Sequence, residues 1–214
     1  MSTLRITEIF LSLQGEANTV GRPTIFVRLT GCPLRCQYCD SEYAFSGGTT
    51  MDLDAILAKV DELGVPHVTV TGGEPLAQPN VIALMQCLVD AGKAVSLETS
   101  GALNVADVPA DVVKVLDLKT PGSNESHRNL WENLSHLNAQ DQIKFVLCSR
   151  ADYDWARMRC DEHSLYERVA DVLFSPSHHE LAPRELADWI VADRLPVRMQ
   201  MQMHKLLWGD VPGY

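Results

Sequence analysis

Three cysteines lie close together in this chain, and their number and spacing imply metal chemistry. Cys32, Cys36 and Cys39 follow a C-x3-C-x2-C pattern with no fourth cysteine nearby. A closed structural zinc site takes four ligands, and a fully cysteine-ligated iron–sulfur cluster also takes four thiolates. Three thiolates leave one iron of a 4Fe–4S cube open to a small chelating ligand. The alternatives are a zinc site completed by a distant histidine and a chance grouping of cysteines in a turn.

Length and composition place limits on the rest of the interpretation. The chain has 214 residues, of which 46% are hydrophobic and 21% charged, and this composition predicts a single core domain over residues 1–214. A net charge of −10 argues against broad non-specific binding of nucleic acid. The sequence has no apolar run long enough to span a membrane and no signal-peptide region at its start. We therefore expect a cytoplasmic protein with neither a nucleic-acid nor a membrane partner.

Segments of strand type and helix type alternate about six times. Strands are expected at 6–11, 24–30, 67–71, 94–98, 112–118, 142–147, 172–174 and 197–201, and helices at 52–63, 80–91, 126–137, from about 152, and at 183–192. This alternation predicts right-handed crossovers and a parallel sheet. A complete eightfold barrel typically needs about 250 residues, so the length favours an incomplete (β/α)6 TIM-like barrel. A doubly wound open sheet is the alternative that the pattern leaves open.

Polar motifs follow the expected strands at their carboxyl ends, which is where parallel α/β folds build their sites. These motifs are the cysteine loop, residues 72–75, 98–101, 117–119 and 175–178, and His204.

Two of these motifs resemble the radical S-adenosylmethionine (SAM) enzymes. One is the cysteine loop, in which the aromatic Tyr38 precedes the last cysteine, and the other is Gly72-Gly73-Glu74-Pro75. The resemblance implies a radical SAM barrel with a 4Fe–4S cluster on the three cysteines and SAM on the open iron. It also implies that the glycine-rich segment holds the methionine end of SAM, where the Glu74 carboxylate can take up the ammonium group.

Further segments resemble the 7-carboxy-7-deazaguanine synthase family, and the likeness spans nearly the whole chain. These segments are residues 13–16, 26–28, 31–32, 39–41, 98–101 and 203–209. The resemblance implies a homodimeric carbon–nitrogen lyase that contracts the ring of 6-carboxy-5,6,7,8-tetrahydropterin with loss of ammonia, through a 5′-deoxyadenosyl radical. The product, 7-carboxy-7-deazaguanine, leads to queuosine, a modified nucleoside of tRNA. An electron donor such as flavodoxin is implied as a partner.

The resemblance also assigns roles to individual residues. Arg28 supplies a forked donor for the substrate carboxylate, and the hydroxyl of Ser41 suits Mg²⁺, which prefers oxygen ligands. The substrate contacts implied are Leu13, Gln14, Gly15, Glu16, Arg28, Thr99 and His204. The cofactor contacts implied are Tyr38, Asp40, Gly72, Gly73, Glu74, Ser100, Gly101, Lys119, Ser149, Ser175 and Ser177.

Several of these residues also have a purely structural interpretation. Arg28 can lie on an exposed face, Ser41 can cap a helix, Lys119 can be a solvated lysine and His204 can be a packing residue. The chain also departs from the family pattern at three places. Ala17 stands where a second glycine is usual, Ser175-Pro176 replaces Gln-Pro, and the tail of residues 210–214 differs, so no contact is assigned to it.

Two competing functions remain at this point. A glycyl-radical-enzyme activating enzyme shares the cluster and a similar size but acts on a partner protein. A zinc-binding scaffold or regulatory module would use the cysteines without catalysis.

Overall fold

The computed structural model describes residues 2–178, 180–209 and 211, and its centre is one sheet of nine strands. The strand order is β3-β1-β2-β4-β5-β6-β7-β8-β9. The strands are β1 (Thr3–Leu13), β2 (Pro23–Leu29), β3 (Thr49–Asp52), β4 (His67–Gly72), β5 (Ala94–Thr99), β6 (Val113–Asp117), β7 (Gln142–Leu147), β8 (Asp171–Pro176) and β9 (Arg198–Met199).

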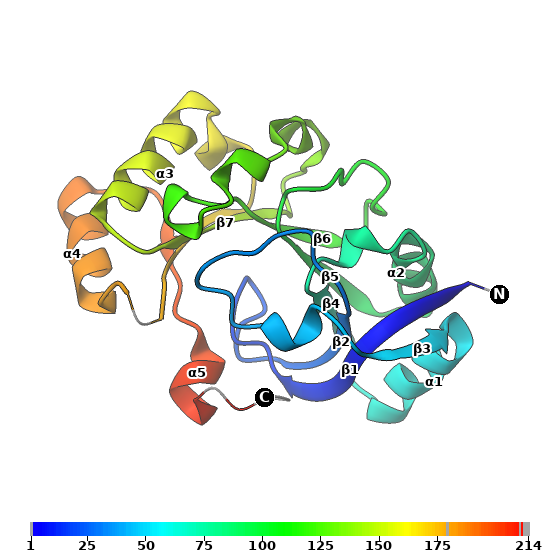
Figure 1. The fold of residues 1–214 in the computed structure, drawn as a ribbon. Coiled ribbons are helices and arrows are strands. Elements are labelled where there is room, and N and C mark those ends of the chain that lie inside the picture. Colours follow the sequence, from blue (N-terminus) through cyan, green and yellow to red (C-terminus); the bar gives the residue numbers. More distant parts are fainter. Residues whose placement is uncertain (1, 179, 210, 212–214) are drawn as a thin grey trace.

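The helices lie along the outer side of this curved sheet, while the loop after β2 crosses its concave side (Figure 1). The α-helices are α1 (Leu53–Leu63), α2 (Val81–Asp90), α3 (Arg150–Glu162), α4 (Pro183–Asp193) and α5 (Met203–Trp208). Short 3-10 helices cover Glu42–Ala44, Pro75–Ala77, Pro121–Ser123, Ser126–Arg128, Trp131–His136 and Leu165–Glu167. No helix in the described part of the chain is both long and apolar enough to cross a membrane.

The strand order decides between the two predicted topologies. From β2 to β9 the strands pair in parallel, each with the next parallel strand along the chain. A doubly wound sheet would reverse its order at a switch point, and this sheet does not. Because the edge strands β3 and β9 do not pair with each other in the described part of the chain, the barrel is open, and the predicted incomplete barrel is confirmed.

Several predicted elements were wrong or missing. The expected helix at 126–137 is instead two 3-10 segments, because the Asn129 and Asn133 side chains bind the backbone of Lys119 and of residues 101–105. The last strand is only two residues long, and α5 holds His204. The antiparallel pairs of β1 with β2 and with β3 were not predicted as such.

The two faces of the barrel strands differ in polarity, and this difference creates the interior site. On β4 and β5 the side chains of Val68, Val70, Val95 and Leu97 are buried in the hydrophobic core. The alternate residues face inward, where Thr69 and Ser96 share a hydrogen bond of 2.8 Å.

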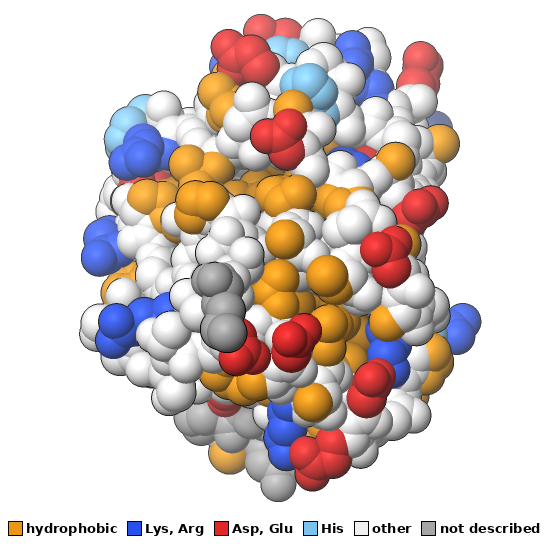
Figure 2. Space-filling view, turned by 90° about the vertical axis from the view of Figure 1, so that its right-hand side faces the viewer, with side chains coloured by type: hydrophobic (Ala, Val, Ile, Leu, Met, Phe, Trp, Pro, Cys, Tyr) orange, Lys and Arg blue, Asp and Glu red, His pale blue; other side chains and the backbone are white. Residues whose placement is uncertain are grey.

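On the side of α1 and α2, Figure 2 shows apolar side chains gathered over the middle of the face, with acidic groups beside them.

Candidate active site

A cavity of about 700 Å³ opens at the carboxyl ends of the parallel strands. The predicted site residues that line it are Leu13, Gln14, Gly15, Glu16, Arg28, Cys32, Cys36, Tyr38, Cys39, Asp40, Ser41, Gly72, Gly73, Thr99, Ser100, Lys119, Ser177 and His204. Segments that are distant in sequence therefore meet at one site, as their positions after successive strands predicted.

Four predicted cofactor contacts do not line this cavity: Glu74, Gly101, Ser149 and Ser175. The Ser149 hydroxyl caps α3 by accepting a hydrogen bond from the Asp152 amide at 3.3 Å. Ser175 is buried within β8, and Gly101 has a positive φ of 71° in a turn whose carbonyl accepts a bond from Leu130. These four residues lie behind the residues that line the cavity and support them.

The cysteine loop is fastened directly to the glycine-rich segment. The Glu74 amide donates to the Gly31 carbonyl at 2.8 Å, and the Gly73 amide donates to the Leu29 carbonyl at 3.2 Å. A Cβ atom on Gly73 would lie 2.8 Å from the Cβ of Cys32, and one on Gly72 would collide with the backbone of Leu29. The glycines are therefore required by the close packing of these two loops, besides any approach of a ligand.

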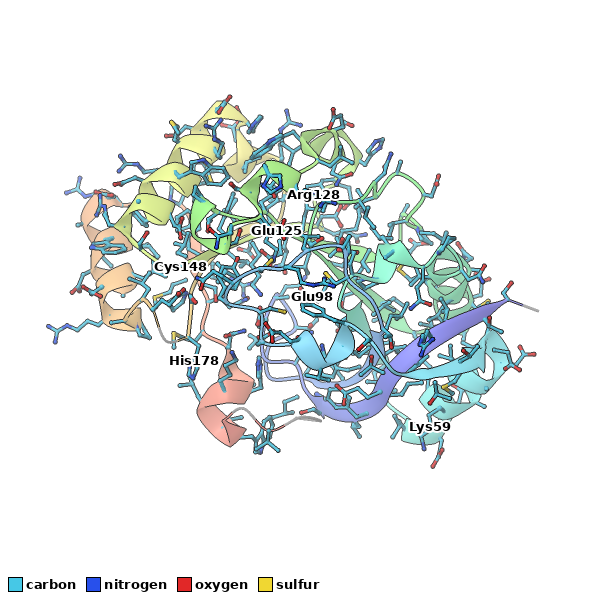
Figure 3. All side chains as sticks on the ribbon, in the orientation of Figure 1. Lys59, Glu98, Glu125, Arg128, Cys148 and His178 are labelled. Atoms are coloured by element: carbon cyan, nitrogen blue, oxygen red, sulfur yellow. The ribbon has the colours of Figure 1, made fainter. Side chains whose placement is uncertain are left out.

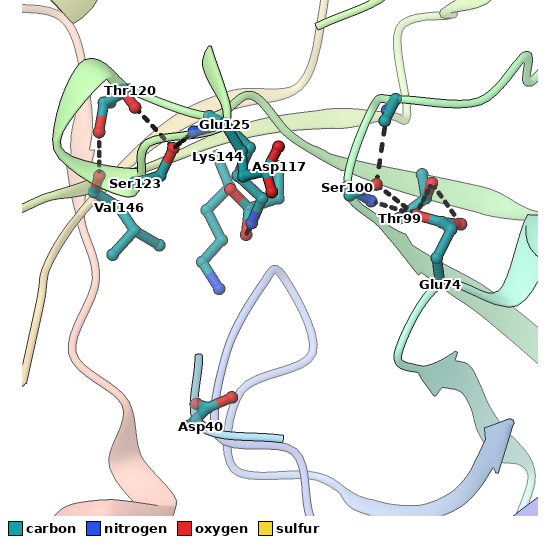
Figure 4. Close-up of polar contacts among 12 residues, drawn as sticks. Asp40, Glu74, Thr99, Ser100, Asp117, Thr120, Ser123, Glu125, Lys144 and Val146 are labelled. Carbon is teal, nitrogen blue, oxygen red and sulfur yellow. Dashed lines mark hydrogen bonds and ion pairs between the residues drawn. The ribbon is translucent and has the colours of Figure 1, made fainter. Parts of the chain in front are cut away.

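The Glu74 carboxylate has a different role from the predicted ammonium contact. It is fully buried and accepts bonds from the Thr99 hydroxyl at 2.9 and 3.0 Å, and from the Ser100 amide and hydroxyl at 2.7 and 2.5 Å (Figure 4). It also accepts the Leu76 amide at 3.0 Å. The acceptor sites of this side chain are occupied in joining the ends of β4 and β5, and its contact with an ammonium group stays a prediction.

The three cysteine thiols share one wall and influence one another. Burial raises the pKa of Cys36 to about 11, and it raises the pKa of Cys32 and Cys39 as well. Metal or cluster binding on these residues must therefore release protons. Within the described residues, no group of three or more His, Cys, Asp or Glu side chains is arranged to hold a single metal ion.

The loop between β1 and β2 enters the barrel and is held there by buried polar groups. Gln14 donates to the Thr69 hydroxyl at 3.0 Å, and the Ala17 amide donates to the Gln200 side chain at 2.6 Å. Glu16 forms an ion pair with Lys144 and accepts a bond from Gln200 at 2.9 Å. This loop therefore presents one face to the cavity while its other polar groups are satisfied.

Helix α5 covers the same loop from the C-terminal side. The Met203 amide donates to the Gly15 carbonyl at 3.1 Å, and a Cβ atom on Gly15 would collide with the His204 ring. Burial lowers the pKa of His204, although Glu16 and Asp40 oppose this shift. Of the tail beyond α5, Asp210 and residues 212–214 lie outside the described residues.

Two cationic side chains of the predicted site are inside the cavity and are already paired. The Arg28 Nε atom lies 2.7 Å from Glu8, which also accepts the Tyr43 hydroxyl at 2.8 Å. The Lys119 ammonium lies 2.9 Å from Asp117. Burial lowers its pKa, but the charges of Asp117, Tyr38 and Cys36 together outweigh this effect and raise it. With side chains only 15% and 10% exposed, neither residue is the solvated surface cation of the alternative interpretation.

Asp40 and Ser41 connect the cysteine loop to α5. The Ser41 hydroxyl donates to Asp40 at 2.9 Å and makes no capping bond to the short helix that follows, so the capping interpretation is wrong. Lys205 lies 3.5 Å from Asp40. Burial opposes ionisation of Asp40, but Lys205 and the hydrogen bond from Ser41 lower its pKa to about 2.

The sequence analysis missed several residues that face the cavity. Glu98, Asp117 and Lys144 all line it from the inward faces of β5, β6 and β7. Two hydrophilic atoms in this region, Oδ1 of Asp117 and the hydroxyl of Tyr38, are buried without a hydrogen-bond partner. The available signal was one charged residue on the inward face of each of β5, β6 and β7.

Comparison with known proteins gives a consistent family assignment. The Radical SAM superfamily matches residues 26–118. The 7-carboxy-7-deazaguanine synthase of Koribacter versatilis is 46% identical over 96% of this chain and 97% of its own length. The enzyme of the same name from Chlorobaculum tepidum is 42% identical over 96% of this chain and 94% of its own.

A solved structure agrees with this assignment at the level of the fold. The crystal structure of QueE from Escherichia coli superposes with a TM-score of 0.78 at 23% identity, covering 95% of this chain and 96% of that one. From the sequence identities over nearly full length, the chain belongs to the 7-carboxy-7-deazaguanine synthase family of the radical SAM superfamily.

Proposed function

We propose that this protein is a 7-carboxy-7-deazaguanine synthase that converts 6-carboxy-5,6,7,8-tetrahydropterin to 7-carboxy-7-deazaguanine with loss of ammonia. The observation that carries the proposal is one cavity that unites the three cysteines with the Gln14–Glu16 loop and Arg28. The relatives that bear this name match 96% of this chain.

The residues present suit a 4Fe–4S cluster and SAM. Cys32, Cys36 and Cys39 would hold the cluster, and the unpartnered Oδ1 of Asp117 and hydroxyl of Tyr38 offer buried polar atoms to a bound cofactor. When bound, the cluster and SAM together supply the 5′-deoxyadenosyl radical that removes a hydrogen atom from the substrate. The cavity walls formed by Gly72, Gly73, Ser100, Lys119 and Ser177 would orient SAM and limit the access of water.

The opposite wall suits a flat anionic heterocycle. The backbone of Leu13 and Gly15, with the side chains of Gln14 and Glu16, offers the donors and acceptors that a pterin ring requires. Arg28 and a Mg²⁺ ion on Ser41 would take the carboxylate, with Thr99 and His204 completing the enclosure. Because Glu8 already pairs with Arg28, the guanidinium is held in position before the substrate arrives.

The assembly and cellular context are part of the same proposal. We infer a single core domain over residues 1–214, supported by the one continuous sheet from β1 to β9. We further propose a homodimer in the cytoplasm that takes electrons from a donor such as flavodoxin. Light scattering during size-exclusion chromatography tests the dimer, and anaerobic reduction of the cluster by flavodoxin tests the donor.

An anaerobic assay with SAM, a reductant, Mg²⁺ and the carboxypterin tests the activity. We expect 7-carboxy-7-deazaguanine and ammonia in equal amounts over many turnovers, and no product from Cys32→Ala, Cys36→Ala or Cys39→Ala. Cys87→Ala is the matched control, because Cys87 lies on α2 outside the cavity. Turnover with cysteine-to-alanine variants, or stoichiometric zinc without iron uptake, would overturn the proposal.

A further inference from the structure

Among the described acidic side chains that line the cavity, Glu98 is the one without a hydrogen bond or ion pair. It stands at the carboxyl end of β5, on the inward face that it shares with Ser96, and it lines the cavity. Figure 3 places it near the middle of the barrel. Among the described residues, no side chain or backbone amide forms an ion pair or hydrogen bond with its carboxylate. The other cavity carboxylates have partners: Glu16 pairs with Lys144, Asp117 with Lys119, Asp40 with Ser41 and Lys205, and Glu180 accepts a hydrogen bond from Gln37.

The surroundings of Glu98 favour its neutral form without fixing it. Burial raises its pKa to about 8, and the charges of Glu16 and Asp117 act in the same direction. Lys144 on β7 and Lys119 after β6 oppose this shift, but each is already paired with another carboxylate. On the other side, β4 contributes the neutral Thr71, and α5 contributes His204 and Lys205 to the cavity. Glu98 can therefore both give and accept a proton near neutral pH, which an exposed glutamate does poorly.

The proposed reaction needs such a group, and this inference rests on that reaction. The conversion of the carboxypterin to the deazaguanine loses NH₃ and is redox-neutral overall. The ring contraction breaks both carbon–nitrogen bonds of the departing ring nitrogen, joins its two former carbon neighbours by a new carbon–carbon bond, and moves two hydrogens from carbon to nitrogen overall. In the final elimination, the second carbon–nitrogen bond breaks with its electron pair going to nitrogen, and a carbon–hydrogen bond breaks with its pair entering the new ring double bond. One proton must therefore leave a carbon atom and one must reach the departing nitrogen.

Most other titratable groups of the cavity are unsuited to this transfer. The pKa of Lys119 and of Lys144 is raised, so each stays protonated, and Asp40, with a pKa of about 2, stays ionised. His204, whose pKa is lowered by burial, is the rival candidate and serves as the comparison in the test.

We propose that Glu98 is a general acid–base residue of the reaction, which accepts the proton from the ring carbon and delivers a proton to the departing nitrogen. One carboxyl group can serve both transfers, because the proton that it takes from carbon balances the proton that it gives to nitrogen.

The test separates hydrogen-atom transfer from proton transfer. Reconstituted Glu98→Gln enzyme receives SAM, reductant and substrate deuterated at its saturated ring carbons. We expect deuterium still to enter 5′-deoxyadenosine, while release of 7-carboxy-7-deazaguanine and ammonia falls at least about 100-fold. Glu98→Asp should keep partial activity with a displaced pH profile, whereas His204→Gln should keep the pH profile of the wild type.

Each result bears on the proposal. Glu98→Gln turnover within about threefold of wild type, or a Glu98→Asp profile identical to wild type, overturns it. If His204→Gln loses the pH dependence of turnover that the wild type shows, the proton transfer is assigned to His204 instead. If Glu98→Gln fails to fold by circular dichroism, the Glu98→Asp profile decides. If wild-type enzyme itself makes no product, the proposed function fails, and that result is distinct from a failure at Glu98.

Discussion

Lys144 on β7 forms an ion pair with Glu16 in the loop after β1, deep inside the barrel. Their side chains are only 9% and 12% exposed, and Figure 4 shows the Lys144 side chain directed into the cavity. Burial lowers the pKa of Lys144, but Glu16, Asp117 and Glu98 outweigh this effect and raise it. The pair fixes the substrate loop to the strand on the far side of the sheet, so it links the position of the predicted pterin contacts to the barrel itself.

Replacing Lys144 with methionine should therefore be strongly destabilising. The change leaves the Glu16 carboxylate in a poorly hydrated place with only the amides of Gln200 and Gln202 as donors. We expect a loss of ~3–5 kcal/mol in the free energy of unfolding, measured by urea denaturation. The matched control is Lys59→Met, which breaks an exposed pair with Glu62 and should cost at most ~1 kcal/mol. Equal effects of the two substitutions would show that the buried pair has no special role, and Lys144→Met with Glu16→Gln should recover part of the loss.

Glu74 should contribute to stability even without any cofactor. In Glu74→Gln, the new amide group would face the donors of Ser100 and Thr99, because the Glu74 carboxylate accepts every hydrogen bond that it makes. We expect the cofactor-free protein to lose ~2–3 kcal/mol of stability, with Glu62→Gln on the exposed face of α1 as a control that changes little. Unchanged stability of the cofactor-free variant, combined with weaker SAM binding, would restore the direct cofactor role that the sequence suggested.

Glu74 also illustrates where sequence reasoning reached its limit. The cysteine loop, the glycine-rich turn and the strand order could be predicted from local patterns, because strand periodicity and turn residues depend on neighbouring positions in the sequence. The direction of the Glu74 side chain depends on Thr99 and Ser100 on the neighbouring strand. The failed helix at 126–137 has the same cause, since Asn133 binds the backbone of a loop some thirty residues earlier. Residues 98–101 were recognised as a site motif, but Glu98 received no role because the sequence does not show which side chains of β5 face inward.

Ala17 has a side chain at a position whose backbone conformation favours glycine. Its φ of 61° lies in the left-handed region, which costs a non-glycine residue ~1–2 kcal/mol. Replacement by glycine removes this cost but loses a buried methyl group, worth ~0.8 kcal/mol, and increases the unfolded-state entropy by ~0.4–1 kcal/mol. We expect Ala17→Gly to change the free energy of unfolding by less than ~1 kcal/mol.

Ala17→Val is the sharper substitution at this position. A β-branched side chain at positive φ, in a site with only 3% exposure, combines backbone strain with overpacking. We expect it to destabilise the fold by at least ~2 kcal/mol in the same urea measurement. A valine variant as stable as the glycine variant would mean that this loop changes its backbone conformation easily, and its hydrogen bond to Gln200 would then have no fixed geometry.

His204 should make the stability of the protein depend on pH. Because burial lowers its folded pKa below the usual value, the neutral ring is favoured in the fold. Its contribution is therefore complete above about pH 6.5 and is lost as the pH falls from there through the folded pKa. Asp40 stays ionised throughout this range, since its pKa is about 2, so its contact with Lys205 adds nothing to the change of stability with pH.

We expect the melting temperature of the wild type to fall relative to that of His204→Gln between pH 7 and pH 5. The other histidines are present in both proteins and cancel in the comparison. If the wild type gained stability relative to His204→Gln over that interval, the ring would be better stabilised as a cation, with Glu16 and Asp40 outweighing burial at this end of the cavity.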